Sequence, residues 1–267
     1  MRKLVTVLLL VSLGSFAGQA LADPLRDAVD DDGRTEEERE RDRYRHPYDT
    51  LAFFGLEPEM TVVELYPGGG WYSAVLASYL ADEGRLVAAH FNLEQENAPA
   101  YYERLHKSFT ERFVESGRYG DVEVIAFDPP EKSSLGEPGS ADMVLTFRNI
   151  HSWIGSGQLE NVFAAAHEVL RPGGVFGVVG HRLPEDREQD PDAGTGYVKE
   201  SVVIDAAEEA GFTLAERSEV NANPLDDADH PNGVWTLPPN LNVPEGENEE
   251  DYLRIGESDR FTLKFVK

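Results

Sequence analysis

The 267-residue sequence contains no cysteine. Disulfide bonds, thiolate nucleophiles and thiolate metal sites are therefore all excluded. Basic residues are also scarce, because 24 Lys and Arg stand against 50 Asp and Glu, which gives a formal charge of −26. A surface of this sign repels phosphate backbones and anionic membranes, so we expect no nucleic-acid partner.

Long apolar runs are rare as well, and the one that stands out lies at the start of the sequence. Residues 4–13 are mostly apolar, follow Arg2-Lys3 and precede Ala20-Leu21-Ala22, which predicts a secretory signal peptide over residues 1–22, cleaved after Ala22. Polar residues at positions 12, 15 and 19 disfavour the alternative, a retained membrane anchor of about 20 apolar residues. We expect a periplasmic or secreted mature chain without stable membrane insertion. Its charge is −28, because two of the 24 basic residues are removed and all 50 acids remain.

The next segment, residues 23–47, is a charged N-terminal extension without a sustained apolar period. We expect it to be frayed before a short solvated helix. Within it, residues 41–47 have two interpretations: a charged helix end, or a lid of three arginines with Tyr44 and His46 that folds over a ligand site. A second short helix is expected over residues 48–56, ending at Gly55.

Residues 48–267 are interpreted as one domain, because 40% hydrophobic content supports a core and no internal repeat interrupts it. Strands and helices alternate along it, which is typical of an α/β fold with helices on both faces of a parallel sheet. Strands are predicted at residues 61–65, 86–89, 122–127, 142–147, 175–179, 212–220 and 261–265, the last as an edge or antiparallel strand. Helices are predicted at residues 70–81, 98–113, 159–170 and 198–210. Arg171-Pro172-Gly173-Gly174 is expected to stop the third helix.

A long irregular insertion is predicted at residues 221–257. Loops of this length inside a compact domain are usually functional or disordered. Trp235 indicates that part of the insertion packs against the domain.

The first strand runs into a glycine cluster, Pro67-Gly68-Gly69-Gly70, which opens the first helix. Glycine has no Cβ, so backbone N–H groups and the helix N-terminus can approach a polar ligand closely, and Glu64 just before the turn can accept hydrogen bonds. A purely structural turn is the alternative. The spacings of a phosphate-binding loop, a dinucleotide site and a serine-hydrolase elbow are all absent.

Ligands of open α/β sheets bind at the carboxyl ends of the strands. Arg148, Asn149 and His151 follow the fourth strand, and His181 and Arg182 follow the fifth, so we expect them to meet at one pocket. Histidine can act as a general base or acid near neutral pH. His151 is the first candidate for that role and His181 the second, the alternative being histidines that satisfy buried backbone groups.

Residues 62–182, with the terminal strands, resemble class I S-adenosylmethionine-dependent methyltransferases. The resemblance extends to an exported bacterial subgroup of predicted methyltransferases with counterparts of residues 53–56 (FFGL), 67–72 (PGGGWY), 148–151 (RNIH) and 256–260 (GESDR). It implies a Rossmann-like three-layer sandwich with a mostly parallel seven-stranded sheet and an antiparallel last strand. It also implies S-adenosylmethionine as cofactor and methyl transfer to a small-molecule acceptor.

The resemblance further implies that Glu64 contacts the methionine amino group of the cofactor and that the glycine turn passes beneath it. The sequence departs from the family at Tyr66, where a glycine is usual, and at His90 and Asn92, where an acid usually holds the ribose. Asp128 matches the position that reaches adenine, although a turn-forming Asp before proline is equally consistent. The cofactor-binding set implied in this way is Glu64, Tyr66, Gly68, Gly69, Gly70, Trp71, Tyr72, His90, Asn92, Asp128, Arg148 and Asn149.

Two alternatives remain open. S-adenosylmethionine is made in the cytoplasm, so an exported chain could instead be a non-catalytic periplasmic small-molecule or nucleoside-binding protein that kept the fold. His90, His151 and His181 could also meet around a metal with Asp128 as an oxygen ligand. No metal-binding spacing supports the second alternative, so we predict no metal. The sequence does not specify the acceptor or the oligomeric state.

Overall fold

The computed structural model describes residues 23–95 and 98–267, so the predicted signal peptide at 1–22 lies outside the described residues. Its central sheet has seven strands in the order β3-β2-β1-β4-β5-β7-β6. The strands are β1 (Thr61–Leu65), β2 (Arg85–Phe91), β3 (Asp121–Phe127), β4 (Ala141–Phe147), β5 (Leu170–His181), β6 (Thr213–Ser218) and β7 (Arg260–Val266). All neighbours from β3 to β5 are parallel, and β7 runs antiparallel to both β5 and β6. The predicted α/β class and the antiparallel last strand are confirmed.

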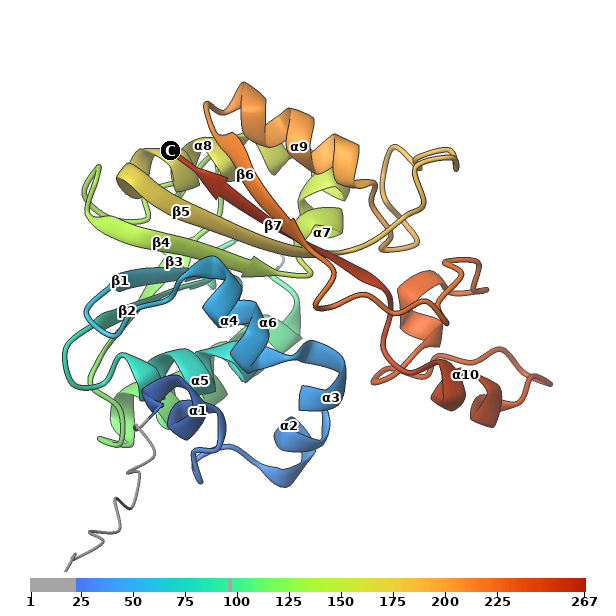
Figure 1. The fold of residues 1–267 in the computed structure, drawn as a ribbon, viewed down its shortest axis with the longest axis horizontal. Helices are drawn as coiled ribbons and strands as arrows, with labels where there is room; N and C mark the ends of the chain where they lie inside the picture. Colours follow the sequence, from blue (N-terminus) through green and yellow to red (C-terminus); the bar gives the residue numbers. More distant parts are fainter. Residues whose placement is uncertain (1–22, 96–97) are drawn as a thin grey trace, which may run out of the picture.

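Helices cover both faces of the sheet (Figure 1). One face carries α1 (Pro24–Val29), α4 (Pro47–Phe54), α5 (Trp71–Tyr79) and α6 (Ala100–Thr110), the last continued by a π-helical turn, η1 (Glu111–Glu115). The other face carries α7 (Ile150–Gly155), α8 (Leu159–Val169) and α9 (Glu200–Glu209). Successive strand residues point to opposite faces, so Val62 packs into the first layer and Val63 into the second. Burial on both faces explains why the central strands are almost continuously apolar.

The helix before Arg171-Pro172-Gly173-Gly174 ends within one residue of the predicted position, but the next strand begins before the predicted residue 175. Helix α8 ends at Val169, and the four residues belong to the start of β5. Leu170 pairs with Ala141 but Val175 pairs with Met143, so the segment between them forms an irregularity in the strand. Its backbone is held by the chain end, where the Gly173 N–H donates to the Lys267 carbonyl at 2.9 Å.

The expectation of a frayed N-terminal extension is wrong. Residues 23–47 form α1, α2 (Glu36–Glu40) and α3 (Asp42–Arg45), and the apolar side chains of α1 are buried in the core. Arg34 is only 1% exposed and bonds Asp42 through its Nη2 at 2.6 Å. Glu38 of α2 is in turn bound by Arg112 at 2.7 Å. The buried apolar side chains of α1 and these ion pairs together hold the segment in place. Ion pairs leave no apolar period in the sequence.

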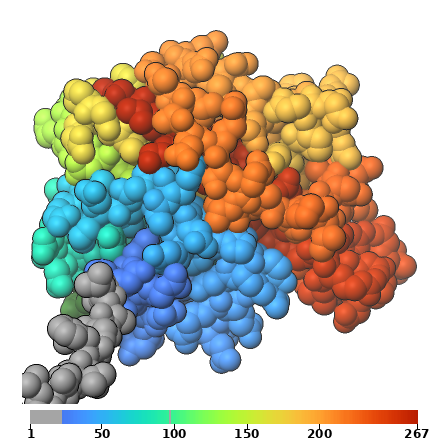
Figure 2. All heavy atoms as spheres, in the orientation of Figure 1, coloured from blue at the N-terminus to red at the C-terminus, as the bar shows by residue number. Residues whose placement is uncertain are grey.

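The insertion at residues 221–257 is largely turns, with a 3-10 turn, η2 (Gly233–Thr236), and one helix, α10 (Glu249–Ile255). Leu183, Tyr197 and Val234 form a small apolar cluster against which Trp235 packs, as predicted. The N-terminal helices and the insertion meet at the molecular surface (Figure 2). Over the part of the chain that the structure describes, no helix is both long and apolar enough to cross a membrane.

Candidate functional site

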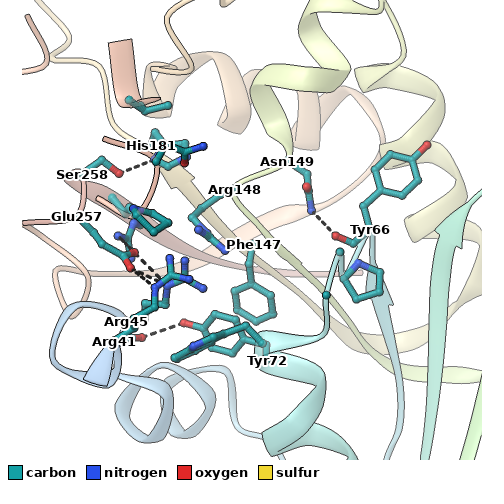
Figure 3. Close-up of a pocket in the computed structure, with 18 of the residues that line it drawn as sticks. Arg41, Arg45, Tyr66, Tyr72, Phe147, Arg148, Asn149, His181, Glu257 and Ser258 are labelled. Carbon is teal, nitrogen blue, oxygen red and sulfur yellow. Dashed lines mark hydrogen bonds and ion pairs between the residues drawn. The ribbon is translucent and has the colours of Figure 1, made fainter. Parts of the chain in front are cut away.

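A cavity of about 490 Å³ opens at the carboxyl ends of β1, β4 and β5 (Figure 3). Four parts of the chain line it: the glycine loop after β1, the ends of β4 and β5, the N-terminal helices, and the middle of the insertion (residues 234–240) with the turn before β7. Arg41 and Arg45 are among the lining residues. Of the two interpretations of residues 41–47, the structure therefore favours a segment folded over a ligand site.

The glycine loop meets the cavity with two of its three glycines. Gly68 and Gly69 line the cavity, whereas Gly70 does not. Gly68 has φ +60° and a Cβ there would meet nothing within 4 Å, so its conformation rather than lack of space favours glycine. A Cβ on Gly70 would lie 2.3 Å from Phe113 Cε2. Gly70 is therefore required by the packing of α5 against η1.

Glu64, at the end of β1, lines the same cavity although only 2% of it is exposed. Its Oε2 accepts a hydrogen bond from Ser73 Oγ at 2.5 Å. Burial raises the pKa of Glu64 to about 7, against the opposing effects of Ser73 and the charge of Arg148. Glu64 is therefore partly protonated at neutral pH and can both accept and donate a hydrogen bond.

Tyr66 occupies the position where the family has glycine, and its backbone has the left-handed φ of +48° that glycine suits better. Its ring packs among aromatic side chains, with centroid distances of 5.1 Å to Phe91, 5.9 Å to Phe127 and 5.7 Å to Trp153. The ring points away from the arginines of the cavity (Figure 3). Tyr66 therefore borders the cavity without filling the space beside the glycine loop.

His90 does not reach the cavity, in contrast to its predicted ribose-binding role. It is 0% exposed, and its Nδ1 accepts from the Phe91 N–H at 2.9 Å. The proton must then be on Nε2, which lies 3.1 Å from the Gly68 carbonyl and donates to it. Burial lowers the pKa of His90 to about 4, so it is neutral. His90 supports the glycine loop from below.

Asn92 and Asp128 also lie outside the cavity lining. Asn92 Nδ2 donates to Asp128 Oδ2 at 3.1 Å, and the Asp128 backbone pairs with Lys132. The two predicted ribose and adenine contacts therefore bond each other. Of the predicted cofactor set, the cavity brings together Glu64, Tyr66, Gly68, Gly69, Trp71, Tyr72, Arg148 and Asn149.

Asn149 and Arg148 have different tasks at the end of β4. Asn149 Nδ2 donates to the Leu65 carbonyl at 3.0 Å and to Thr146 Oγ1 at 3.2 Å, so it ties β4 to β1. Arg148 has a left-handed φ of +66°, and its N–H donates to the Val179 carbonyl at 2.6 Å. This conformation leaves the guanidinium in the cavity. Burial, with the charges of Arg260 and Arg41, lowers the pKa of Arg148 to about 10.

The two predicted catalytic histidines do meet at the cavity. The ring centroids of His151 and His181 are 5.7 Å apart, and His181 Nδ1 lies 2.5 Å from Ser258 Oγ. Burial, helped by the charge of Arg148, lowers the pKa of His151 to about 4. Burial and the charge of His151 lower the pKa of His181 well below its usual range. Both imidazoles are neutral at pH 7.

No role is predicted from the sequence for Glu257, Ser258 and Arg260, although they belong to the 256–260 segment that carries the resemblance. Glu257 Oε1 lies 2.7 Å from Arg41 Nε, and Glu257 Oε2 lies 3.0 Å from Arg45 Nε and 2.5 Å from Arg260 Nη2. Burial opposes ionisation, but the charges of Arg260 and Arg45 lower the pKa of Glu257 to about 2. The segment joins the insertion to the N-terminal helices across the cavity.

The suggested metal site of His90, His151, His181 and Asp128 is not assembled. In residues 23–95 and 98–267 the one grouping with metal-ligand spacing is Asp226, Asp227 and His230. The Asp226 carboxylate is already engaged, because Tyr197 Oη donates to it at 2.9 Å and two backbone N–H groups and His230 contact it as well. This group braces the insertion.

No protein-family model and no curated protein matches the sequence. Solved structures match in fold, including geranyl diphosphate C-methyltransferase from Streptomyces coelicolor A3(2), at TM-score 0.58 and 13% identity over 90% of this chain and 87% of that chain. A S-adenosylmethionine-dependent methyltransferase from Aquifex aeolicus matches at TM-score 0.52 and 20% identity over 75% and 94%. The cyclase SpnF matches at TM-score 0.56 and 14% identity over 91% and 92%. The fold is thus the Rossmann-like fold of class I S-adenosylmethionine-dependent methyltransferases.

Proposed function

We propose that the protein is an S-adenosylmethionine-dependent methyltransferase that acts on a small molecule. The observation that carries this proposal is the position of Glu64 and the Gly68-Gly69 turn, which border one cavity at the carboxyl ends of the strands. Ligands of this type of sheet bind there. A cavity of about 490 Å³ is in the range of small-molecule sites.

The fit to the cofactor is better at one end than at the other. Glu64 and the turn offer a hydrogen-bond acceptor and close backbone approach for the methionine end. His90, Asn92 and Asp128, implied by the resemblance for ribose and adenine, bond other protein groups outside the cavity. Phe91 is the β2 side chain that lines the cavity and offers an apolar contact to the adenosine end.

When bound, S-adenosylmethionine supplies an electrophilic methyl group on a sulfonium. The chain's own contribution is alignment of the acceptor and removal of its proton where it carries one. We assign that proton to a ring nitrogen of His151, which is neutral and lines the cavity. His181 lies beside His151, and its hydrogen bond with Ser258 holds the turn before β7 against the two histidines.

A second candidate is a binding protein without catalysis on the same fold. It is favoured by the engagement of Asn92 with Asp128, which leaves the usual adenosine contacts unavailable to a ligand. A fold of this kind does not fix the reaction. SpnF, described as a cyclase, illustrates this point.

Thermal melting of the purified protein with S-adenosylmethionine and with S-adenosylhomocysteine separates the two candidates. A ligand that binds only the folded state raises the melting midpoint. At a ligand concentration of 100 times its Kd, the free energy of unfolding increases by about 2.7 kcal/mol. We expect both compounds to raise it. Absence of any rise at millimolar concentration contradicts the methyltransferase and favours the binding protein.

We also propose that the chain is exported, on the strength of residues 1–22. Fractionation of producing cells, with mass measurement of the purified chain, tests this. A periplasmic or secreted chain that begins at Asp23 is expected. A cytoplasmic chain that retains Met1 contradicts it, and that outcome places the protein where its cofactor is made.

A further inference from the structure

Four arginines gather at the end of the cavity where the N-terminal helices meet the turn before β7: Arg41, Arg45, Arg148 and Arg260. One fully ionised carboxylate, Glu257, faces them, and three of the four bind it. The local excess of positive charge is opposite to the net charge of −26 carried by the chain.

The other two acids of the cavity lining do not neutralise this excess. Glu38 is bound by Arg112 at 2.7 Å and by the N–H of Thr35 at 2.9 Å. Glu64 is bonded to Ser73, and burial keeps it partly protonated. Among the acids of the cavity lining, Glu257 is therefore the one that neutralises the positive charge of these arginines.

Several donors of these arginines have no acceptor. Arg260 Nε and Arg41 Nη2 are buried without a hydrogen-bond partner in the described parts of the chain. Among those same residues, the Arg148 guanidinium makes neither an ion pair nor a hydrogen bond, and the one bond of Arg148 is through its backbone N–H. Buried guanidinium groups are costly unless they are paired. An oxyanion supplies the missing acceptors, because arginine binds carboxylate and phosphate through paired N–H donors.

The neighbouring wall is aromatic. Tyr72 stacks on Phe147 with ring centroids 3.5 Å apart, and the guanidinium of Arg45 lies 4.7 Å from the ring of Trp71. The Arg148 side chain lies beside Phe147 with its guanidinium toward Arg45 (Figure 3). The combination suits a small molecule with an apolar body and one anionic group.

We propose that this end of the cavity binds a carboxylate or phosphate group of the methyl acceptor, with Arg148 as its principal donor. The identification of the ligand as the acceptor rests on the proposed function, whereas the anion site does not. One other oxyanion has the same chemistry, the methionine carboxylate of the cofactor. The experiment has to distinguish these two sources.

The probes are sodium phosphate and sodium acetate, added to the purified protein at constant ionic strength against sodium chloride. Melting midpoints are measured for the wild type, Arg148→Met and Arg43→Met. Arg43 is exposed on the same N-terminal segment as Arg41 and does not line the cavity, so it controls for the loss of one positive charge. The Arg148 guanidinium has no protein partner to lose, and Met keeps the unbranched stem of the side chain, so Arg148→Met is expected to fold.

We expect phosphate or acetate to raise the midpoint of the wild type and of Arg43→Met equally. In Arg148→Met the apparent affinity for that anion is expected to fall about tenfold or more, because a charge-assisted hydrogen bond is lost. No rise in the wild type, or the same affinity in Arg148→Met, overturns the proposal. Which of the two anions binds more tightly identifies the acceptor as a carboxylate or a phosphate.

Repeating the titration with saturating S-adenosylhomocysteine separates the two sources. An unchanged anion affinity supports a separate acceptor subsite. Competition between the anion and S-adenosylhomocysteine overturns the proposal, because the arginines then hold the cofactor carboxylate. If S-adenosylhomocysteine fails to bind while the anion still depends on Arg148, the anion site stands and the proposed methyl transfer falls.

Discussion

Arg45 and Glu257 are 212 residues apart in the sequence, and the Arg45 Nε lies 3.0 Å from Glu257 Oε2. Arg45 is 2% exposed and Glu257 is 3% exposed. Together with Arg41 and Arg260, this pair closes the cavity between the N-terminal helices and the turn before β7. The charged extension is therefore an integral wall of the site.

Replacement of Glu257 by Gln is expected to lower the free energy of unfolding by about 3 kcal/mol, since it leaves the buried Arg45 and Arg260 and the partly buried Arg41 without their carboxylate. Urea denaturation measures this effect. Glu250→Gln, on the exposed surface of α10, is the matched control and should stay within about 0.5 kcal/mol of wild type. Equal effects of the two substitutions would show that the Glu257 cluster does not stabilise the fold.

Substitution of the two glycines that flank Gly69 is expected to separate binding from folding. Gly68→Ala costs about 1 kcal/mol through its positive φ but leaves the core intact, and it places a Cβ where the cofactor approaches. Gly70→Ala forces Phe113 to move and is expected to cost more, about 1–3 kcal/mol. Urea denaturation and binding of S-adenosylhomocysteine check both. Normal binding by Gly68→Ala and Gly68→Val contradicts the assignment of the turn.

Stability should fall on acidification through His90. Its folded pKa of about 4 lies below the usual 6.5, so its contribution is present above pH 6.5 and is lost as the pH falls toward 4. Glu64 acts in the opposite sense, because its pKa is raised to about 7 and its contribution disappears as the pH rises from 4.5 through 7. The free energy of unfolding can be measured by urea denaturation at a series of pH values. Its slope against pH should be lower in His90→Gln than in the wild type, by up to about 1.4 kcal/mol per pH unit. Parallel curves for variant and wild type refute the neutral buried imidazole.

The pKa of His151 should respond to Arg148. Burial is the main cause of its low value of about 4, and the charge of Arg148 is the second. In Arg148→Met the pKa is expected to rise but to stay below 6.5, as followed by the NMR shift of the imidazole Cε1 proton. Arg43→Met serves as the control and should leave it unchanged. If the pKa of His151 is the same in Arg148→Met as in the wild type, the Arg148 guanidinium does not act on His151 and the prediction is wrong.

The sequence predicts the sheet because the alternation of strands and helices is a local pattern. Side chains at the carboxyl ends of parallel strands meet at one edge of the sheet, and this rule predicts that four residues come together: Arg148, Asn149, His151 and His181. The role of the 256–260 segment could not be inferred in this way. Glu257 meets Arg45 through tertiary contacts that have no sequence period. His90 was misplaced for a related reason. It lies near the end of β2, where the resemblance implies a ribose-binding residue, but its two ring nitrogens are satisfied by Phe91 and Gly68.

A crystal structure of the protein with S-adenosylhomocysteine shows whether the cavity is the cofactor site. We expect the ligand in the cavity, with its amino acid end against Glu64 and the Gly68-Gly69 turn and with Arg148 free for a second ligand. A ligand bound elsewhere, or with its carboxylate on Arg148, would refute this assignment.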